Sequence, residues 1–365
     1  MTEQLHKRIP VLDSVRGLAA FWVFLSHSFG CAQITTKVPI LGDGRAGVDI
    51  FMILSGFLMF HLYRNVDFGA SLGRFWTARF FRISPVYYFL LALSAAAIPN
   101  IPTASTSYFL VCGSYLFGFL PQPSGTGMPD WSIALEMQFY VTFPILAVFL
   151  RNKGWLPLVS VSAGLSVIFH LLWSVYTINP PGIFGTFCSP TLLPFKLPMF
   201  LLGGFFSDPC FFRNIRHACL FLALNFIGVA FPACLLTGYK SSVVIYISCI
   251  SIVYLWKLEY TSFQSIISPL RALLSSSSLR FFGDISYSVY LIHAYIFTYF
   301  SGMLVNWLHW DKSSSFIRVI SLLIICGPII YLLSWIMYRC IESPCISIGR
   351  KISWALFPGK QSRIF

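Results

Sequence analysis

The amino-acid sequence predicts an all-α fold, a polytopic membrane protein built from transmembrane helices. Of its 365 residues, 57% are hydrophobic and only 10% are charged, and the mean hydropathy is +0.76. Soluble domains are about 25% charged, and a single soluble core would not hide this much apolar surface. The composition therefore indicates helices that cross a lipid bilayer.

Apolar stretches long enough to cross a membrane recur along the whole chain. We expect about ten spans, at 11–31, 46–63, 83–98, 131–150, 155–175, 191–206, 218–236, 241–257, 283–306 and 316–338. The stretch Tyr108–Leu120 is apolar but short, and we interpret it as a re-entrant or interfacial segment rather than an eleventh span.

The distribution of positive charge gives these spans a direction. With the N-terminus in the cytoplasm, 18 of the 25 Lys and Arg residues fall on the cytoplasmic side and five fall outside. This positive-inside pattern predicts that both termini are cytoplasmic. It also accounts for the net charge of +13, so we expect no nucleic-acid partner. We expect one membrane-embedded domain over 1–365, with a short cytoplasmic tail from about 339 to 365 and no appended soluble domain.

Arg16 and His27 lie eleven residues apart inside the first predicted span. At about 100° per residue, this spacing ends about 20° past three full turns, so both side chains share one helix face, about 16 Å apart. Ionisable side chains inside a membrane are costly and mark functional sites. We therefore interpret both as catalytic candidates, with Arg16 near the inner end of the span and His27 in its outer third.

The fourth predicted span brings a carboxylate to a similar depth. Glu136 lies about five residues below the outer end of that span, and Ser132 and Tyr140 share its helix face by i, i+4 spacing. A carboxylate beside an imidazole orients a general base. We expect Glu136 to pair with His27, and Ser132 and Tyr140 to bind substrate. The alternative is a structural ion pair between two spans.

A second basic cluster, GRFWTARFFRISPVYY, lies between the second and third predicted spans. Arg79 and Arg82 are spaced i, i+3, and Trp76 is one of several aromatic residues near them. Guanidinium groups bind phosphates in a bidentate manner and stack on flat rings. We expect Arg79, Arg82 and Trp76, together with Arg16, to bind a nucleotide-like donor. The alternative is an ordinary positively charged cytoplasmic loop.

Two further polar residues lie inside predicted spans. Asp49 falls near the outer end of the second span and is a candidate third member of the outer site. His293 falls near the middle of the ninth span, where a buried structural histidine is the usual finding, and it is also a substrate-binding candidate. The ten cysteines show no metal-binding spacing, so we expect no metal.

Six sequence motifs resemble, in order, those of the acyltransferase-3 family of membrane acyltransferases. They run from Leu12 to Pro344 and read LDSVRGLAAFWVFLSH, GVDIFMILSGFLM, RFFRISPVYY, WSIALEMQFY, FGDISYSVYLIH and IESP. The resemblance implies transfer of an acyl group, commonly acetyl, from cytoplasmic acyl-CoA (acetyl-CoA) to a hydroxyl group of an envelope glycan. Lipopolysaccharide O-antigen and other exopolysaccharides are such acceptors. The implied partners are acyl-CoA, a carbohydrate or glycolipid and the lipid bilayer, and the implied location is the bacterial cytoplasmic (inner) membrane.

The same resemblance implies roles for individual residues. Arg16 and His27 match the family's essential pair, Arg79 and Arg82 match its Arg-x-x-Arg motif, and Glu136 matches the carboxylate of its Trp-Ser motif. We expect His27 to act as general base on the acceptor hydroxyl, with a covalent acyl-histidine as the rival path. A transporter or flippase of a lipid-linked glycan is the alternative function, although the sequence shows no internal repeat of the kind common in transporters.

Overall fold

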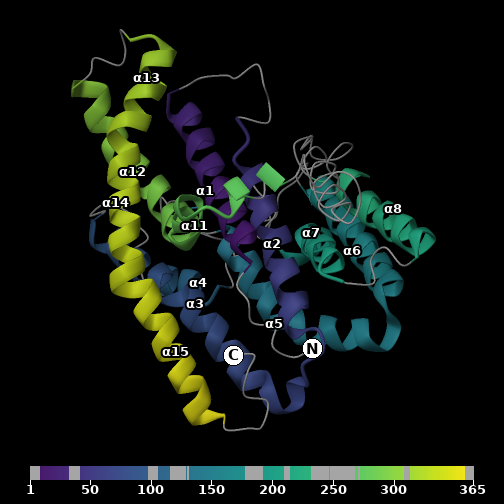
Figure 1. Ribbon diagram of the computed structural model, residues 1–365. Coiled ribbons are helices and arrows are strands. Elements are labelled where there is room, and N and C mark those ends of the chain that lie inside the picture. The colour runs from purple at the N-terminus through teal and green to yellow at the C-terminus, as the bar shows by residue number, and fades with distance from the viewer. Residues whose placement is uncertain are drawn as a thin grey trace.

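The computed structural model of the chain describes residues 9–32, 42–97, 106–115, 129, 131–176, 192–208, 214–231, 246, 268–269, 272–307 and 313–357. Within these residues all regular secondary structure is helical (Figure 1). The prediction of a helical protein is confirmed for this part of the chain.

The N-terminal two thirds of the chain contain eight described helices that follow most of the predicted spans. They are α1 (Pro10–Cys31), α2 (Arg45–Tyr63), α3 (Phe68–Ala97), α4 (Thr106–Gly113), α5 (Trp131–Lys153), α6 (Trp155–Tyr176), α7 (Leu193–Phe206) and α8 (Ile215–Phe231). The predicted span at 241–257 lies outside the described residues apart from Tyr246.

Four described helical stretches are long and apolar enough to cross a membrane: Arg45–Tyr63, Trp131–Lys153, Trp155–Leu172 and Ser315–Leu356. Two shorter apolar helices, Leu193–Phe206 and Ile215–Ala230, accompany them. These lengths support an integral membrane protein. The total of about ten spans and the cytoplasmic position of both termini stay predictions.

The apolar stretch Tyr108–Leu120 is described only as far as Tyr115. Its helix, α4, has eight residues, which at about 1.5 Å per residue is too short to cross a bilayer. Tyr115 follows with a φ of 60°, a left-handed conformation that a continuing helix would not adopt.

The basic cluster before the third predicted span is helical rather than a loop. α3 starts at Phe68, well before the predicted start at 83, and continues through Pro85 without a break. Arg79 and Arg82 therefore project from one side of a rigid helix, about one turn apart.

The C-terminal helix is longer than predicted. After α11 (Ser277–Asp284) and α12 (Ser286–Trp307), the helices α13 (Ser315–Ser321), α14 (Gly327–Met337) and α15 (Ser343–Leu356) are joined by π-helical turns into one stretch of 42 residues. Figure 1 shows this stretch beside α12 and α3, which it contacts. The segment expected to be a tail from 339 is thus helical to Leu356. Pro344 does not end the helix because it lies in the first turn of α15, directly after a π-helical turn.

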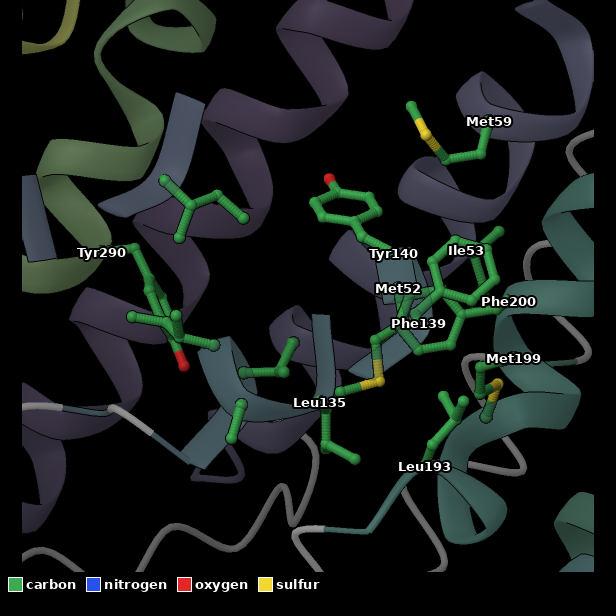
Figure 2. Packing of buried hydrophobic residues seen from close by; sticks show 14 of the residues in the cluster. Met52, Ile53, Met59, Leu135, Phe139, Tyr140, Leu193, Met199, Phe200 and Tyr290 are labelled. Carbon is green, nitrogen blue, oxygen red and sulfur yellow. The ribbon is translucent and has the colours of Figure 1, made fainter. Parts of the chain in front are cut away.

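A close contact between α2 and α7 organises the core. A Cβ at Gly56 would overlap the carbonyl oxygen of Phe200, and one at Gly203 would overlap that of Ile53. Glycine at such a crossing lets two helix backbones touch. Phe139 of α5 stacks on Phe200 with ring centroids 4.1 Å apart (Figure 2). The α5 helix is thereby fixed against this helix pair.

A second glycine contact joins α1 to the end of α11, just before α12 starts. A Cβ at Gly17 would meet the backbone of Gly283, and one at Gly283 would overlap the carbonyl oxygen of Asp13. His27 and His293 each lie ten residues beyond one of these glycines. Shortly after this contact the chain enters α12, which packs along α1 and carries His293.

Candidate active site

A polar cavity of about 530 Å³ lies between α1, α2, α3, α5, α12 and α15. Its wall contains four arginines and three carboxylates from distant parts of the sequence: Arg16, Arg79, Arg82, Arg350, Asp13, Glu136 and Asp284. Ser132 and Tyr140 also line it. The cavity thus brings together six of the predicted site residues, and its excess of positive charge favours an anionic ligand.

Arg79 is held by two tyrosines at the cavity wall. Its Nη2 donates a hydrogen bond of 3.2 Å to the hydroxyl of Tyr63, and its guanidinium lies over the rings of Tyr63 and Tyr140, 5.6 and 5.7 Å from their centroids. Trp76 donates from Nε1 to the carbonyl oxygen of Tyr140 at 3.3 Å, but its side chain is outside the described cavity wall. Trp76 therefore does not line the cavity with the arginines with which it was grouped, although it and Arg79 both contact Tyr140.

Arg82 forms an ion pair with a carboxylate of the C-terminal helix. Its Nη1 lies 3.1 Å from Oε1 of Glu342, although the two groups are not aligned as a hydrogen bond. Oε2 of Glu342 accepts a hydrogen bond of 2.9 Å from Ser288 of α12. Since Glu342 is fully buried, this cluster fixes three helices and the direction of the Arg82 guanidinium.

Glu136 faces the cavity and not the predicted partner His27. Its Oε1 accepts hydrogen bonds from Ser55 of α2, at 2.9 Å, and from the hydroxyl of Tyr140. The expected contact between Glu136 and His27 is absent from the described contacts of both residues. The physical reason is direction: this face of α5 turns toward α2 and α3, whereas His27 turns toward α12.

Ser132 and Tyr290 connect the cavity with the histidines. Their hydroxyl oxygens are 2.6 Å apart, and Tyr290 also donates to the carbonyl oxygen of Pro129 at 3.1 Å. Both line the cavity and are buried. The ring of Tyr290 lies 6.0 Å from that of His293, centroid to centroid, so the histidine pair lies next to a residue of the cavity wall.

His27 and His293 contact each other directly. Nδ1 of His27 lies 2.6 Å from Nε2 of His293, and the rings stack with centroids 4.9 Å apart. Nδ1 of His293 lies 3.0 Å from the carbonyl oxygen of Val289. His293 is fully buried and His27 is partly exposed. Neither histidine is part of the described cavity wall.

These contacts assign the protons of both rings. The carbonyl oxygen of Val289 only accepts, so Nδ1 of His293 carries the proton, and Nε2 of the neutral ring accepts from Nδ1 of His27. The lone pair of His27 then lies on Nε2, which faces the start of α2, where a Cβ at Gly44 would be 3.6 Å away. Nε2 of His27 is thus the nitrogen left to accept a hydrogen bond, while both nitrogens of His293 are occupied.

Asp49 pairs with a residue outside the predicted site. Its carboxylate lies 2.6 Å from Nζ of Lys196 on α7, and Asp49 is fully buried while the Lys196 side chain is 12% exposed. The pair joins α2 to α7, close to their glycine contact. Asp49 therefore lies in the helix interface and not with His27.

Several residues of this arrangement were missed by the sequence analysis. Ser55 sits beside Gly56, so its polar role is hidden by the packing role of its neighbour. Tyr290 precedes His293 by one helical turn, which is a usable signal. No sequence signal pointed to Arg350, because it lies in a segment expected to be a tail.

Comparison with known proteins identifies relatives. A family model described as an acyltransferase domain matches residues 9–339. The acyltransferase MdmB of Streptomyces mycarofaciens is 34% identical over 153 residues, which cover 38% of this chain and 39% of that protein. The O-acetyltransferase OatA of Staphylococcus aureus strain MRSA252 is 26% identical over 393 residues, covering 97% of this chain and 60% of the relative. The peptidoglycan O-acetyltransferase OatA of Listeria monocytogenes is 30% identical over 170 residues, covering 41% of this chain and 26% of the relative.

The matched regions cover less than two thirds of each of these relatives. No solved structure matches the chain. The family model, by contrast, extends over the helices that enclose the cavity up to α14 and includes both histidines. On this match, the chain belongs to the acyltransferase-3 family.

Proposed function

We propose that this protein is a membrane O-acyltransferase that moves an acetyl group from acetyl-CoA to a hydroxyl of an envelope glycan. The observation that carries the proposal is the arginine-lined cavity together with the His27–His293 pair, which the ring of Tyr290, a cavity-wall residue, contacts. The names of the relatives, acyltransferase and O-acetyltransferase, point to the same reaction class.

The donor binds in the cavity. Its phosphates are held by Arg16, Arg79 and Arg82, because guanidinium groups form paired hydrogen bonds with phosphate oxygens. Its acyl end points toward the buried end of the cavity, where Glu136 orients the hydroxyls of Ser55 and Tyr140. This positioning role replaces the expected role of Glu136 as the partner of His27.

His27 acts as the general base. Its Nε2 takes the proton of the acceptor hydroxyl while the oxygen attacks the thioester carbon; the C–S bond breaks, and the imidazolium returns the proton to the departing thiolate. His293 accepts from Nδ1 of His27, which keeps the lone pair of His27 on Nε2 and holds the ring in place. We therefore assign His293 a positioning role instead of substrate binding. An acyl group carried on His27 is the rival path.

The location follows from the same reasoning. Arginines in the cavity and a base outside its wall suit a cytoplasmic donor and an acceptor on the opposite side of the membrane. The positive-inside distribution of Lys and Arg supports this orientation. We propose the bacterial cytoplasmic membrane, with a glycan such as lipopolysaccharide O-antigen or another exopolysaccharide as acceptor.

The test uses membranes from cells with and without this protein, incubated with acetyl-CoA labelled in the acetyl group. The proposal predicts alkali-labile label on envelope glycan only when the protein is present, and loss of that label in His27→Ala. His217→Ala, at the partly exposed start of α8, is the matched histidine control and should label normally. Unlabelled glycan with the wild-type protein would contradict the proposal and favour a transporter of a lipid-linked glycan. Normal labelling by His27→Ala would show that His27 is not the general base.

A further inference from the structure

The helix α15 supplies a wall of the cavity from beyond the family match. The family model ends at residue 339, whereas the C-terminal helix continues to Leu356. Ser343, Ser347 and Arg350 all line the cavity. Their i, i+4, i+7 spacing places them on a single face of the helix.

Contacts with α3 hold this face in place. Gly349 lies so close to the Phe81 side chain that a Cβ there would overlap it. Arg74 stacks over the ring of Trp354, 4.5 Å from its centroid, and donates from Nε to the carbonyl oxygen of Phe357. The orientation of α15 is therefore tied to the helix that carries Arg79 and Arg82.

Arg350, on α15, has different surroundings from the two cavity arginines of α3. Arg79 is engaged by Tyr63, and Arg82 by Glu342. Within the described residues, the guanidinium of Arg350 forms no hydrogen bond or ion pair, and Arg350 is exposed, as is Ser347. Its exposure indicates that it lies where the cavity is open, whereas Ser132 and Tyr290, which also line the cavity, are buried.

We propose that Arg350, with the hydroxyls of Ser343 and Ser347, binds a phosphate monoester at the end of the donor that stays at the cavity mouth. This inference rests on the proposed use of acyl-CoA, whose nucleotide carries such a group at the 3′ position. A guanidinium binds a phosphate dianion through paired hydrogen bonds, and serine hydroxyls add donors. Arg350 accordingly selects donors by their phosphate and takes no part in acyl transfer.

The experiment compares two donors, acetyl-CoA and acetyl-3′-dephospho-CoA, with wild-type protein, Arg350→Gln and Lys351→Gln in the labelled-membrane assay. Lys351 is the matched control, because it is the next residue of α15, is exposed and lies outside the cavity wall. Arg350→Gln should raise the KM for acetyl-CoA about tenfold, the equivalent of about 1.4 kcal/mol. It should leave the KM for the dephospho donor and the kcat for both donors unchanged.

Two further variants keep the proposal testable if Arg350→Gln folds poorly. Arg350→Lys keeps the charge without the paired geometry and should show a smaller rise in the KM for acetyl-CoA. Ser347→Ala is a mild change at an exposed position and should also affect only the phosphorylated donor. In each case Lys351→Gln should match the wild type.

The outcomes separate the inference from the function on which it rests. An equal rise in KM for both donors, or no rise for either, would overturn the phosphate contact while leaving the transferase assignment intact. Absence of transfer from both donors by the wild-type protein would overturn the proposed function itself, and this inference with it.

Discussion

Removal of the His293 imidazole tests how His27 is held. His293→Phe keeps a flat ring among Tyr290, Phe297 and His27 but removes the nitrogen that accepts from Nδ1 of His27. Leaving a buried donor without its acceptor costs about 1–3 kcal/mol, and each 1.36 kcal/mol on a barrier is tenfold in rate. We therefore expect kcat to fall about 10- to 100-fold. The KM for acetyl-CoA should be unchanged, because His293 lies outside the described cavity wall.

The assay measures initial rates of label transfer in membranes, normalised to the amount of folded protein. His293→Gln offers a carbonyl oxygen as acceptor and should recover part of the lost rate. His170→Phe is the matched control, a buried histidine of α6 whose Nδ1 lies 2.7 Å from the carbonyl oxygen of Ser166, and it should retain kcat. Equal kcat for His293→Phe and the wild type would refute the positioning role. A rise in KM without a fall in kcat would assign His293 to donor binding.

Three further substitutions test the supports of the site. Arg82→Gln should raise the KM for acetyl-CoA about tenfold. It should also lower the melting temperature in detergent, because buried Glu342 loses its cation. A change in the KM for the glycan acceptor alone would contradict this. Gly203→Val should destabilise the protein by about 3 kcal/mol in chemical unfolding, since α7 must move away from α2; wild-type stability would contradict the close contact. Asp49→Leu should lower the free energy of unfolding by about 3–5 kcal/mol, and adding Lys196→Met should restore most of this stability. Additive losses in the double variant would show that the pair is not coupled.

Hydropathy and helical periodicity predicted the helices well because each is a local property. The ends of α1, α2, α5 and α6 fall within a few residues of the predicted spans. The predicted start of α3 was wrong because the polar and charged residues between Phe68 and Arg82 lower the hydropathy without breaking the helix. The same holds after Met337, where charged residues suggested a tail although the helix continues.

Counting residues from the membrane surface predicted the depth of each residue but not the direction in which its side chain points. It placed Glu136 and His27 at a similar depth, and nothing in either helix shows which neighbour each side chain faces. The partner of His27 lies 266 positions away, on α12, and the two meet because α1 packs along both α11 and α12. The grouping of Arg16, Arg79 and Arg82 was reachable from sequence because phosphate-binding chemistry has a recognisable residue pattern.

Donor binding by His27→Ala tests most directly the central claim that the cavity binds the donor and His27 carries out the transfer. Labelled acetyl-CoA is added to purified His27→Ala protein with glycan acceptor, and bound and transferred label are measured in one sample. Because His27 lies outside the described cavity wall, we predict wild-type affinity for acetyl-CoA together with no transfer. Loss of donor binding, or transfer at the wild-type rate, would contradict the account.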